Sequence, residues 1–181
     1  SVVNAVSSYT QVMVQKDGGV HMQEYSQGKK KAAVKKIRTT KTHGTIVTFE
    51  PDTEIFKDLV FDWNTIVNHF RGQAYLVKGL RIRCIDARNY QGKLKLEDVH
   101  WFSELDLDLP NYSFYFEGGL VALVKYYNLS QKAIQDTIFY VEKEQDDVMC
   151  EVALQYTDDV SAKIVAYANN IYNPEGGTHV T

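Results

Sequence analysis

Cysteine, proline and long apolar runs are all scarce in this 181-residue chain. The two cysteines, Cys84 and Cys150, lie far apart in alternating apolar segments, which favours buried thiols over a disulfide framework or a metal site. No apolar run reaches the length that spans a membrane, and no signal peptide opens the chain. We therefore expect a cytoplasmic protein without a membrane partner, whose 44% hydrophobic content supports a real core.

The motifs of several enzyme classes are also missing. The glycine pairs 118–119 and 176–177 are isolated and do not form a G-x-x-x-x-G-K phosphate loop. No serine lies in a G-x-S-x-G nucleophile elbow. The five histidines have no metal-ligand spacing with one another or with cysteine. We therefore expect neither a metal site nor a catalytic residue within these 181 residues.

Charge is unevenly distributed, although the formal net charge is only −3. Seven lysines and arginines crowd residues 29–41, and five acidic residues crowd residues 97–108. The basic segment has two interpretations: a surface that contacts nucleic acid, or lysines that protect a sheet edge from pairing with another chain. No aromatic or glycine-rich nucleic-acid motif interleaves the lysines, which favours the sheet edge.

The hydrophobic periodicity predicts a mixture of strands and two helices. Apolar residues recur with helical spacing after a possible cap at Asp62, which predicts an amphipathic helix from 62 to about 76 that covers the preceding sheet. A second helix is predicted over 120–127. The opening, 1–7, has the pattern of a helix interior and no methionine, so we expect a piece of a longer protein. Alternating segments predict strands over 9–15, 20–25, 45–49, 80–84, 112–116, 137–141, 148–156 and 161–171.

Short motifs along nearly the whole chain resemble one family. They are SVVNAVS at 1–7, HGTIVTFEP at 43–51, KGLRI at 78–82, YFEGGL at 115–120, and EVALQYTD, NNI and EGGTHVT from residue 151 onward. In this order and spacing they resemble the B subunit of bacterial DNA gyrase. Residues 87–109 match this family poorly and resemble an enlarged insertion.

The resemblance implies an α+β fold in two parts. Residues 1–100 correspond to the C-terminal part of a GHKL-type ATPase sandwich. Residues 101–181 correspond to part of a ribosomal protein S5 domain 2-like transducer, with the insertion at the junction.

The resemblance also implies a function for the full-length protein, an ATP-dependent type II DNA topoisomerase. It would couple ATP binding and dimer closure to DNA strand passage and negative supercoiling. The expected partners are DNA, the gyrase A protein and a second copy of the gyrase B protein, in an A2B2 heterotetramer. The expected cofactors are ATP and Mg²⁺.

Six residues match positions of the family's nucleotide pocket. Ser1, Val2 and Val3 begin the helix that follows the glycine-rich lid, where free N–H groups and the helix dipole favour phosphate. Thr45 matches a threonine that helps to hold the adenine amino group, and Val47 matches an apolar wall. The remaining match is Lys16, at the pocket rim.

The family's catalytic groups fall outside the chain. The resemblance places the glutamate base, the magnesium-binding asparagine and the adenine-reading aspartate before residue 1. The lysine that reaches the γ-phosphate falls after residue 181. We therefore expect the fragment alone to be inactive.

Three alternatives remain beside the gyrase interpretation. The B subunit of topoisomerase IV shares much of the pattern, although NNI and KGLRI are more similar to gyrase. A separate nucleic-acid-binding module would use the basic segment 29–41 and no nucleotide. Other members of the ATPase superfamily, such as Hsp90-like chaperones and mismatch-repair proteins, fit poorly with EGGTH and VALQY.

Overall fold

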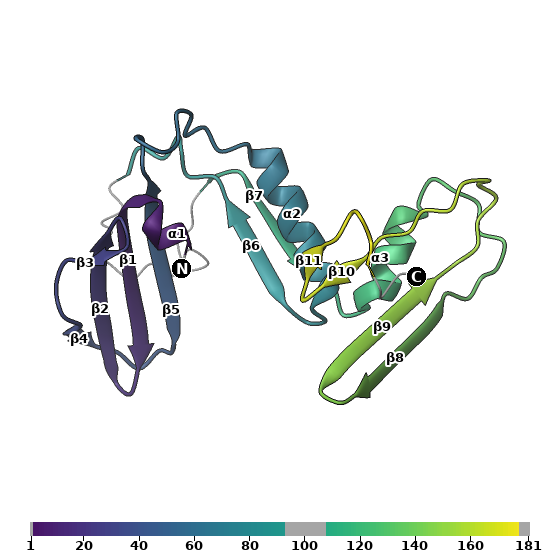
Figure 1. The fold of residues 1–181 in the computed structure, drawn as a ribbon, viewed down its shortest axis with the longest axis horizontal. Coiled ribbons are helices and arrows are strands. Elements are labelled where there is room, and N and C mark those ends of the chain that lie inside the picture. The colour runs from purple at the N-terminus through teal and green to yellow at the C-terminus, as the bar shows by residue number, and fades with distance from the viewer. Residues whose placement is uncertain (1, 93–107, 178–181) are drawn as a thin grey trace. The chain divides into compact units, whose positions relative to one another are not determined.

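The computed structural model describes residues 2–92 and 108–177, which form two compact units (Figure 1). Residues 2–61 build the first unit, and residues 62–89 and 109–177 build the second. Helices interrupt a series of strands that pair antiparallel throughout the described residues, so the expected α+β class is confirmed. The expected domain boundary at residue 100 and most of the insertion 87–109 lie outside the described residues.

The first unit is an antiparallel sheet with a short helix at its start. The sheet has the order β3-β2-β1-β5, and β4 also pairs with β2. Asp17 and Gly18 have φ angles of 52° and 72° in the turn between β1 and β2, the positive values that a tight hairpin turn requires. The elements are α1 (Val2–Ala5), β1 (Ser7–Lys16), β2 (Gly19–Ser26), β3 (Lys29–Lys30), β4 (Lys35–Thr39) and β5 (Gly44–Pro51).

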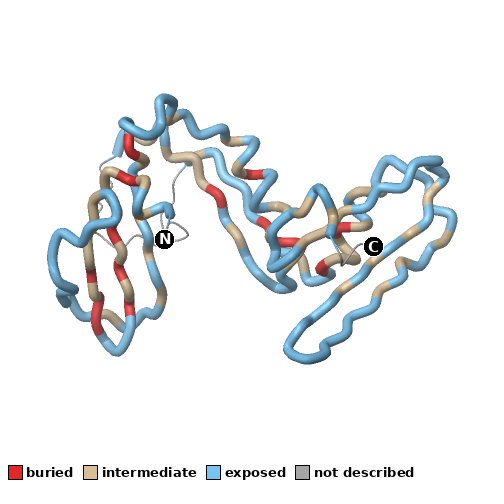
Figure 2. Tube along the Cα trace, viewed as in Figure 1, coloured by how far each residue is buried: buried red, intermediate tan, exposed pale blue. Residues whose placement is uncertain are grey.

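One face of this sheet carries the core of the unit. Met13, Val20 and Met22 are buried together, and Ile37 and Ile46 pack against them. The buried positions follow β1 and β2 (Figure 2). On β1 this face carries Gln11, Met13 and Gln15, whereas the apolar pair Val12 and Val14 lies on the other face. Alternation therefore predicts the strand but not which of its faces is buried.

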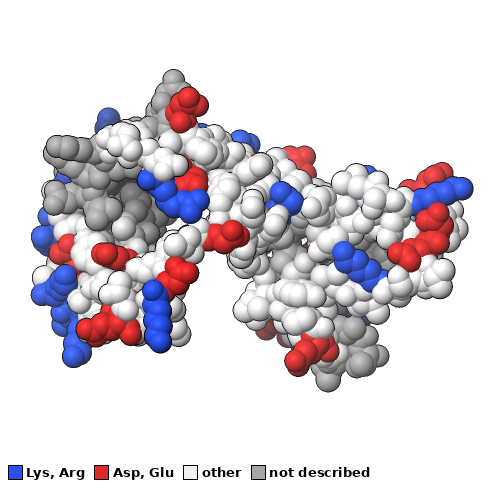
Figure 3. All heavy atoms as spheres, turned by 90° about the horizontal axis from the view of Figure 1, so that it is seen from above, with Lys and Arg blue, Asp and Glu red and all other residues white. Residues whose placement is uncertain are grey.

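The basic segment lies on the outer strands of the sheet. Among the described residues, β3 and β4 pair with β2 alone, so they form an edge. All seven of the segment's lysine and arginine side chains are exposed. Figure 3 shows lysine and arginine side chains along the left edge, the side on which Figure 1 draws these strands. This position agrees with the sheet-edge interpretation.

The second unit combines two helices with two-stranded antiparallel ribbons. Thr65 donates its backbone N–H to Asp62 Oδ1 at 2.6 Å, so the expected helix cap is confirmed. The strands pair as β6 with β7, β8 with β9, and β10 with β11. The elements are α2 (Trp63–Leu76), β6 (Arg81–Ile85), β7 (Asn111–Tyr115), α3 (Gly119–Tyr127), β8 (Phe139–Gln145), β9 (Val148–Leu154), β10 (Tyr167–Ala168) and β11 (Ile171–Tyr172).

The core of the second unit lies between α2 and the β6–β7 ribbon. Val67 and Ala74 of α2 are buried against Cys84 and Phe114 of the ribbon. The expectation that this helix covers the preceding sheet is therefore wrong. Helical periodicity identifies an apolar face but not the surface against which that face packs.

Two further expectations differ from the structure. Cys84 is buried as expected, but Cys150 on β9 is exposed, because both faces of the β8–β9 ribbon are largely open in the described part of the chain. The strand expected over 161–171 is reduced to the two-residue strands β10 and β11. Alternation alone does not supply a partner strand, which a stable strand needs.

The helices of residues 2–92 and 108–177 include none with the length and apolar character needed to cross a membrane.

Alanine substitutions at two glycines of the second unit should have opposite effects on stability. Gly119 is buried with φ +52°, and a Cβ there would lie 2.8 Å from both Cγ and Cε of Lys78. We expect Gly119→Ala to lower the free energy of unfolding by about 1–3 kcal/mol. Equilibrium urea denaturation followed by circular dichroism measures the change.

Gly72 is the matched control, because it lies inside α2 and a Cβ at this position would have no neighbouring atom within 4 Å. Gly72→Ala should raise the free energy of unfolding by up to about 1 kcal/mol. Equal effects of the two substitutions would contradict the proposed difference in backbone conformation and space.

Candidate functional site

Thr45 and Val47 lie on one face of β5. In the antiparallel register, Thr45 is opposite Val14 and Val47 is opposite Val12, so these four side chains share a face. The buried core occupies the other face, where Met13 is opposite Ile46. Thr45 is exposed, and Val47 is 57% exposed. The two predicted pocket residues therefore form an accessible polar and apolar pair.

Lys16 belongs to the same face by the alternation of β1. It is the last residue of β1, two positions beyond Val14, and its side chain is exposed. Residues two apart on a strand are separated by roughly 7 Å. The structure thus brings Lys16, Thr45 and Val47 together at the Gly44 end of β5.

Val2 and Val3 lie at the opposite end of the same sheet. They belong to α1, which precedes Ser7, and Ser7 is opposite Pro51 at the end of β5. Both valines are exposed, with Val2 at 77%. Pro51 is four positions beyond Val47, roughly 13 Å along an extended strand. The predicted set therefore forms two groups at the two ends of β5, and Ser1 lies outside the described residues.

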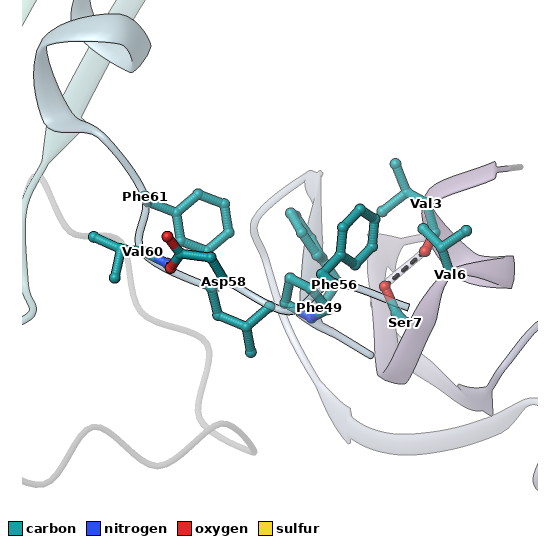
Figure 4. A pocket seen from close by; sticks show the side chains of 10 residues that line it. Val3, Val6, Ser7, Phe49, Phe56, Asp58, Val60 and Phe61 are labelled. Carbon is teal, nitrogen blue, oxygen red and sulfur yellow. Dashed lines mark hydrogen bonds between the residues drawn. The ribbon is translucent and has the colours of Figure 1, made fainter. Parts of the chain in front are cut away.

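An apolar pocket of about 260 Å³ lies at the α1 end of β5 (Figure 4). Figure 4 shows Phe49 and Phe56 beside each other, with Val3 and Val6 next to them. The Ser7 hydroxyl donates to the Val3 carbonyl at 2.6 Å, which holds α1 against the start of β1. The lining residues are Val3, Val6, Ser7, Phe49, Pro51, Phe56, Asp58, Leu59, Val60 and Phe61.

The pocket continues the face that carries Thr45 and Val47, because Phe49 is two residues beyond Val47 on β5. Of the five described residues that were matched to the family's nucleotide pocket, Val3 alone lines this cavity. The other apolar residues of the lining fall mainly in 52–61, which has no strand or helix period. The only signal in the sequence is the density of apolar side chains in this short connection.

Asp52 joins the pocket end of β5 to the helix α1. The residue is 4% exposed, and its backbone N–H donates to the Val6 carbonyl at 3.0 Å. Its carboxylate accepts hydrogen bonds from Gln27 Nε2 at 2.6 Å and from the Glu54 backbone N–H at 2.9 Å. The bond from Gln27, with that from Glu54, lowers the pKa of Asp52. The ionised form therefore stabilises this corner of the sheet.

The exposed face of β5, with Lys16 beside it, carries groups that can bind a ligand. A cation, an exposed hydroxyl and an apolar strip fit a ligand that combines negative charge with a flat apolar ring. Among residues 2–92 and 108–177, no three His, Cys, Asp or Glu side chains meet as a metal site.

Comparisons with known proteins identify one family. Residues 119–181 match the family model described as DNA gyrase B. The chain is 39% identical over 188 residues to the DNA gyrase B protein of Thermotoga maritima, an alignment that covers 100% of this chain and 27% of that protein. It is 37% identical to the gyrase B protein of Enterococcus faecalis, over 99% of this chain and 25% of that protein. The chain thus spans about a quarter of the length of these relatives.

Solved structures agree with the sequence comparison. The 43K ATPase domain of Thermus thermophilus gyrase B, in complex with an aminocoumarin, superposes with a TM-score of 0.80 at 29% identity. That match covers 99% of this chain and 44% of the other. The gyrase B protein of Myxococcus xanthus, at 19% identity and a TM-score of 0.78 over 98% of this chain and 47% of the other, shows the same fold.

The fold is therefore that of a gyrase-type ATPase domain, over the part of such a domain that this chain covers. The chain belongs to the DNA gyrase B family. The resemblance carried by the short motifs is confirmed, and the alternatives of topoisomerase IV and of a separate nucleic-acid-binding module find no support in these matches.

The hydrogen bonds of the Asp52 carboxylate predict how the stability of the fold depends on pH. Because its pKa is lowered in the folded state, its stabilisation is present above the unfolded pKa of about 3.9 and is lost as the pH falls through the folded pKa. We expect Asp52→Asn to lower the thermal unfolding midpoint near pH 6 and to have a smaller effect near pH 3. Thermal denaturation followed across this pH range measures both effects.

The matched control is Glu54→Gln, because the Glu54 backbone N–H, and not its carboxylate, contacts Asp52. This variant should follow the wild type at every pH. A loss of stability in Asp52→Asn that is the same at both ends of the pH range would contradict a contribution from the ionised carboxylate.

Proposed function

We propose that this chain is part of the ATP-binding and transducer region of a gyrase-type type II DNA topoisomerase. In the full-length protein, it couples ATP binding and dimer closure to DNA strand passage and negative supercoiling. The observation that carries the proposal is the 39% identity to a gyrase B protein over the whole chain. The TM-score of 0.80 to a gyrase B ATPase domain supports it independently.

The nucleotide contacts of this proposal lie on the exposed face of β5. Thr45 supplies a hydroxyl for the adenine edge, and Val47 supplies an apolar surface for the ring, because the register places both on the face opposite the core. Lys16 supplies a positive charge at the rim of the same face. Val2 and Val3 begin α1 at the other end of the strand, where this proposal puts the phosphates, and the motif match adds Ser1 to the group.

The domain assignment is part of the same proposal. Residues 1–100 form the C-terminal part of the GHKL ATPase domain, and residues 101–181 form part of the transducer. The partners are DNA, the gyrase A protein and a second gyrase B protein, in an A2B2 assembly in the cytoplasm. ATP binds the closed dimer more tightly than the open one, so binding shifts the population towards closure. The transducer passes this closure on as a rigid-body movement.

The proposal predicts that Thr45→Ala weakens ATP binding in the natural full-length protein. Loss of one neutral hydrogen bond corresponds to about a three- to tenfold higher dissociation constant. Isothermal titration calorimetry with a non-hydrolysable ATP analogue measures the change. The fold should be unaffected, because Thr45 lies outside the buried core.

The matched control is Thr39→Ala, because Thr39 is an exposed threonine on β4, and the strands β2 and β1 separate β4 from β5 in the sheet. Its ATP affinity should equal that of the wild type. Equal weakening by both substitutions, or by neither, would remove Thr45 from the nucleotide site. An absence of ATP binding in the wild type would overturn the proposed function itself.

A further inference from the structure

Lys78 reaches three side chains of the β8–β9 ribbon from the turn between α2 and β6. Its Nζ donates to Tyr140 Oη at 2.5 Å and to Glu142 Oε2 at 2.8 Å. The same Nζ forms an ion pair with Glu151 Oε2 at 3.4 Å. The ammonium also lies 4.8 Å from the centre of the Tyr140 ring. One cation thus meets two carboxylates and the electron-rich face of an aromatic ring.

The β8–β9 ribbon contains two opposed carboxylates that a neighbouring cation stabilises. Glu142 of β8 is directly opposite Glu151 of β9 in the antiparallel register. Like charges at directly opposite positions destabilise a strand pair. Tyr140 bridges them in part, with Oη 2.5 Å from Glu142 Oε2 and 2.9 Å from Glu151 Oε2. The phenol has one proton, so it can donate to only one of the two carboxylates at a time and does not neutralise either. Lys78 supplies the positive charge that offsets Glu142 and Glu151.

The stem of Lys78 passes over the start of α3. Gly119 is the first residue of α3, and a Cβ at that position would lie 2.8 Å from both Cγ and Cε of Lys78. The next residue of the turn, Gly79, donates its backbone N–H to the Phe116 carbonyl at 3.3 Å. The α2–β6 turn, the start of α3 and the β8–β9 ribbon therefore meet along one side chain, all within the second unit.

The exposure of these groups makes the contact reversible. The side chains of Lys78 and Glu142 are 40% and 42% exposed, and that of Glu151 is 23% exposed. Ion pairs at such positions contribute little individually and are screened by salt. A contact of this strength can be broken by the binding energy of a ligand, whereas a buried core contact resists such a change.

We propose that Lys78 is a positioning residue that clamps the β8–β9 ribbon to the α2–β6 turn and transmits movement between them. This inference rests on the proposed function, in which Lys78 belongs to the ATPase part and the ribbon belongs to the transducer. The clamp then crosses the proposed boundary between the two parts. Closing the clamp makes the ribbon follow the ATPase part, and opening it lets ATP turnover proceed without strand passage.

The first test measures the clamp itself by hydrogen exchange in the natural full-length protein. Lys78→Met keeps an unbranched stem over Gly119 and removes the charge. We expect backbone amides of β8 and β9 to exchange about three- to fivefold faster in this variant. Lys78→Arg keeps the charge and should restore slow exchange. Lys143→Met, at an exposed lysine of β8 outside the clamp, is the matched control and should match the wild type.

The second test measures coupling as DNA strand-passage events per ATP hydrolysed. Lys78→Met should lower this ratio at least twofold while the KM for ATP stays unchanged, and Lys78→Arg should restore it. Tyr140→Phe, which retains the ion pairs, should lower it less. Faster exchange with an unchanged ratio would reduce the clamp to a structural contact and overturn the proposal, as would unchanged exchange.

The two proposals fail in different ways. A wild-type protein without ATP-dependent supercoiling would overturn the proposed function and the coupling role together. Hydrogen exchange would still decide whether the clamp exists. Normal supercoiling in the wild type, with no effect of Lys78→Met on exchange or on the ratio, would overturn the coupling role alone.

Discussion

The register between β1 and β5 is the constraint on which the first unit depends. Met13 opposite Ile46 places the core on one face, and Val14 opposite Thr45 places the candidate nucleotide contacts on the other. A slip of β5 by one residue against β1 would turn Ile46 out of the core and Thr45 towards it. The hydrophobic core and the candidate site are therefore two results of one pairing. The buried residues that stabilise the sheet also hold the site residues in place.

The second unit shows how one turn serves several elements. The core between α2 and the β6–β7 ribbon fixes the position of the α2–β6 turn. Lys78 leaves this turn, and the absence of a side chain at Gly119 allows its stem to pass. The ammonium ends between two opposed glutamates of the β8–β9 ribbon, which repel each other without it. Buried apolar packing thus sets the position, and a weaker polar contact carries the adjustable link.

Short motifs and periodicity revealed much of this protein from its sequence. Alternation identified β1, β2 and β5, and helical spacing with Asp62 as cap identified α2, because these signals depend on neighbours within a few residues. The motif matches identified the family along nearly the whole chain, residues 87–109 excepted. Period alone failed for residues 161–171, where strand formation depends on a distant partner.

What the sequence by itself determined is most of the longer elements and the family. Tertiary structure decided the partner surface of α2, the exposure of Cys150 and the meeting of Lys78 with Glu142 and Glu151. It also decided that Val3 and Phe49 line one pocket while Thr45 lies towards the other end of β5. The physical reason is range: periodicity records which side of an element is apolar, whereas contacts between residues far apart in sequence depend on how the whole chain packs.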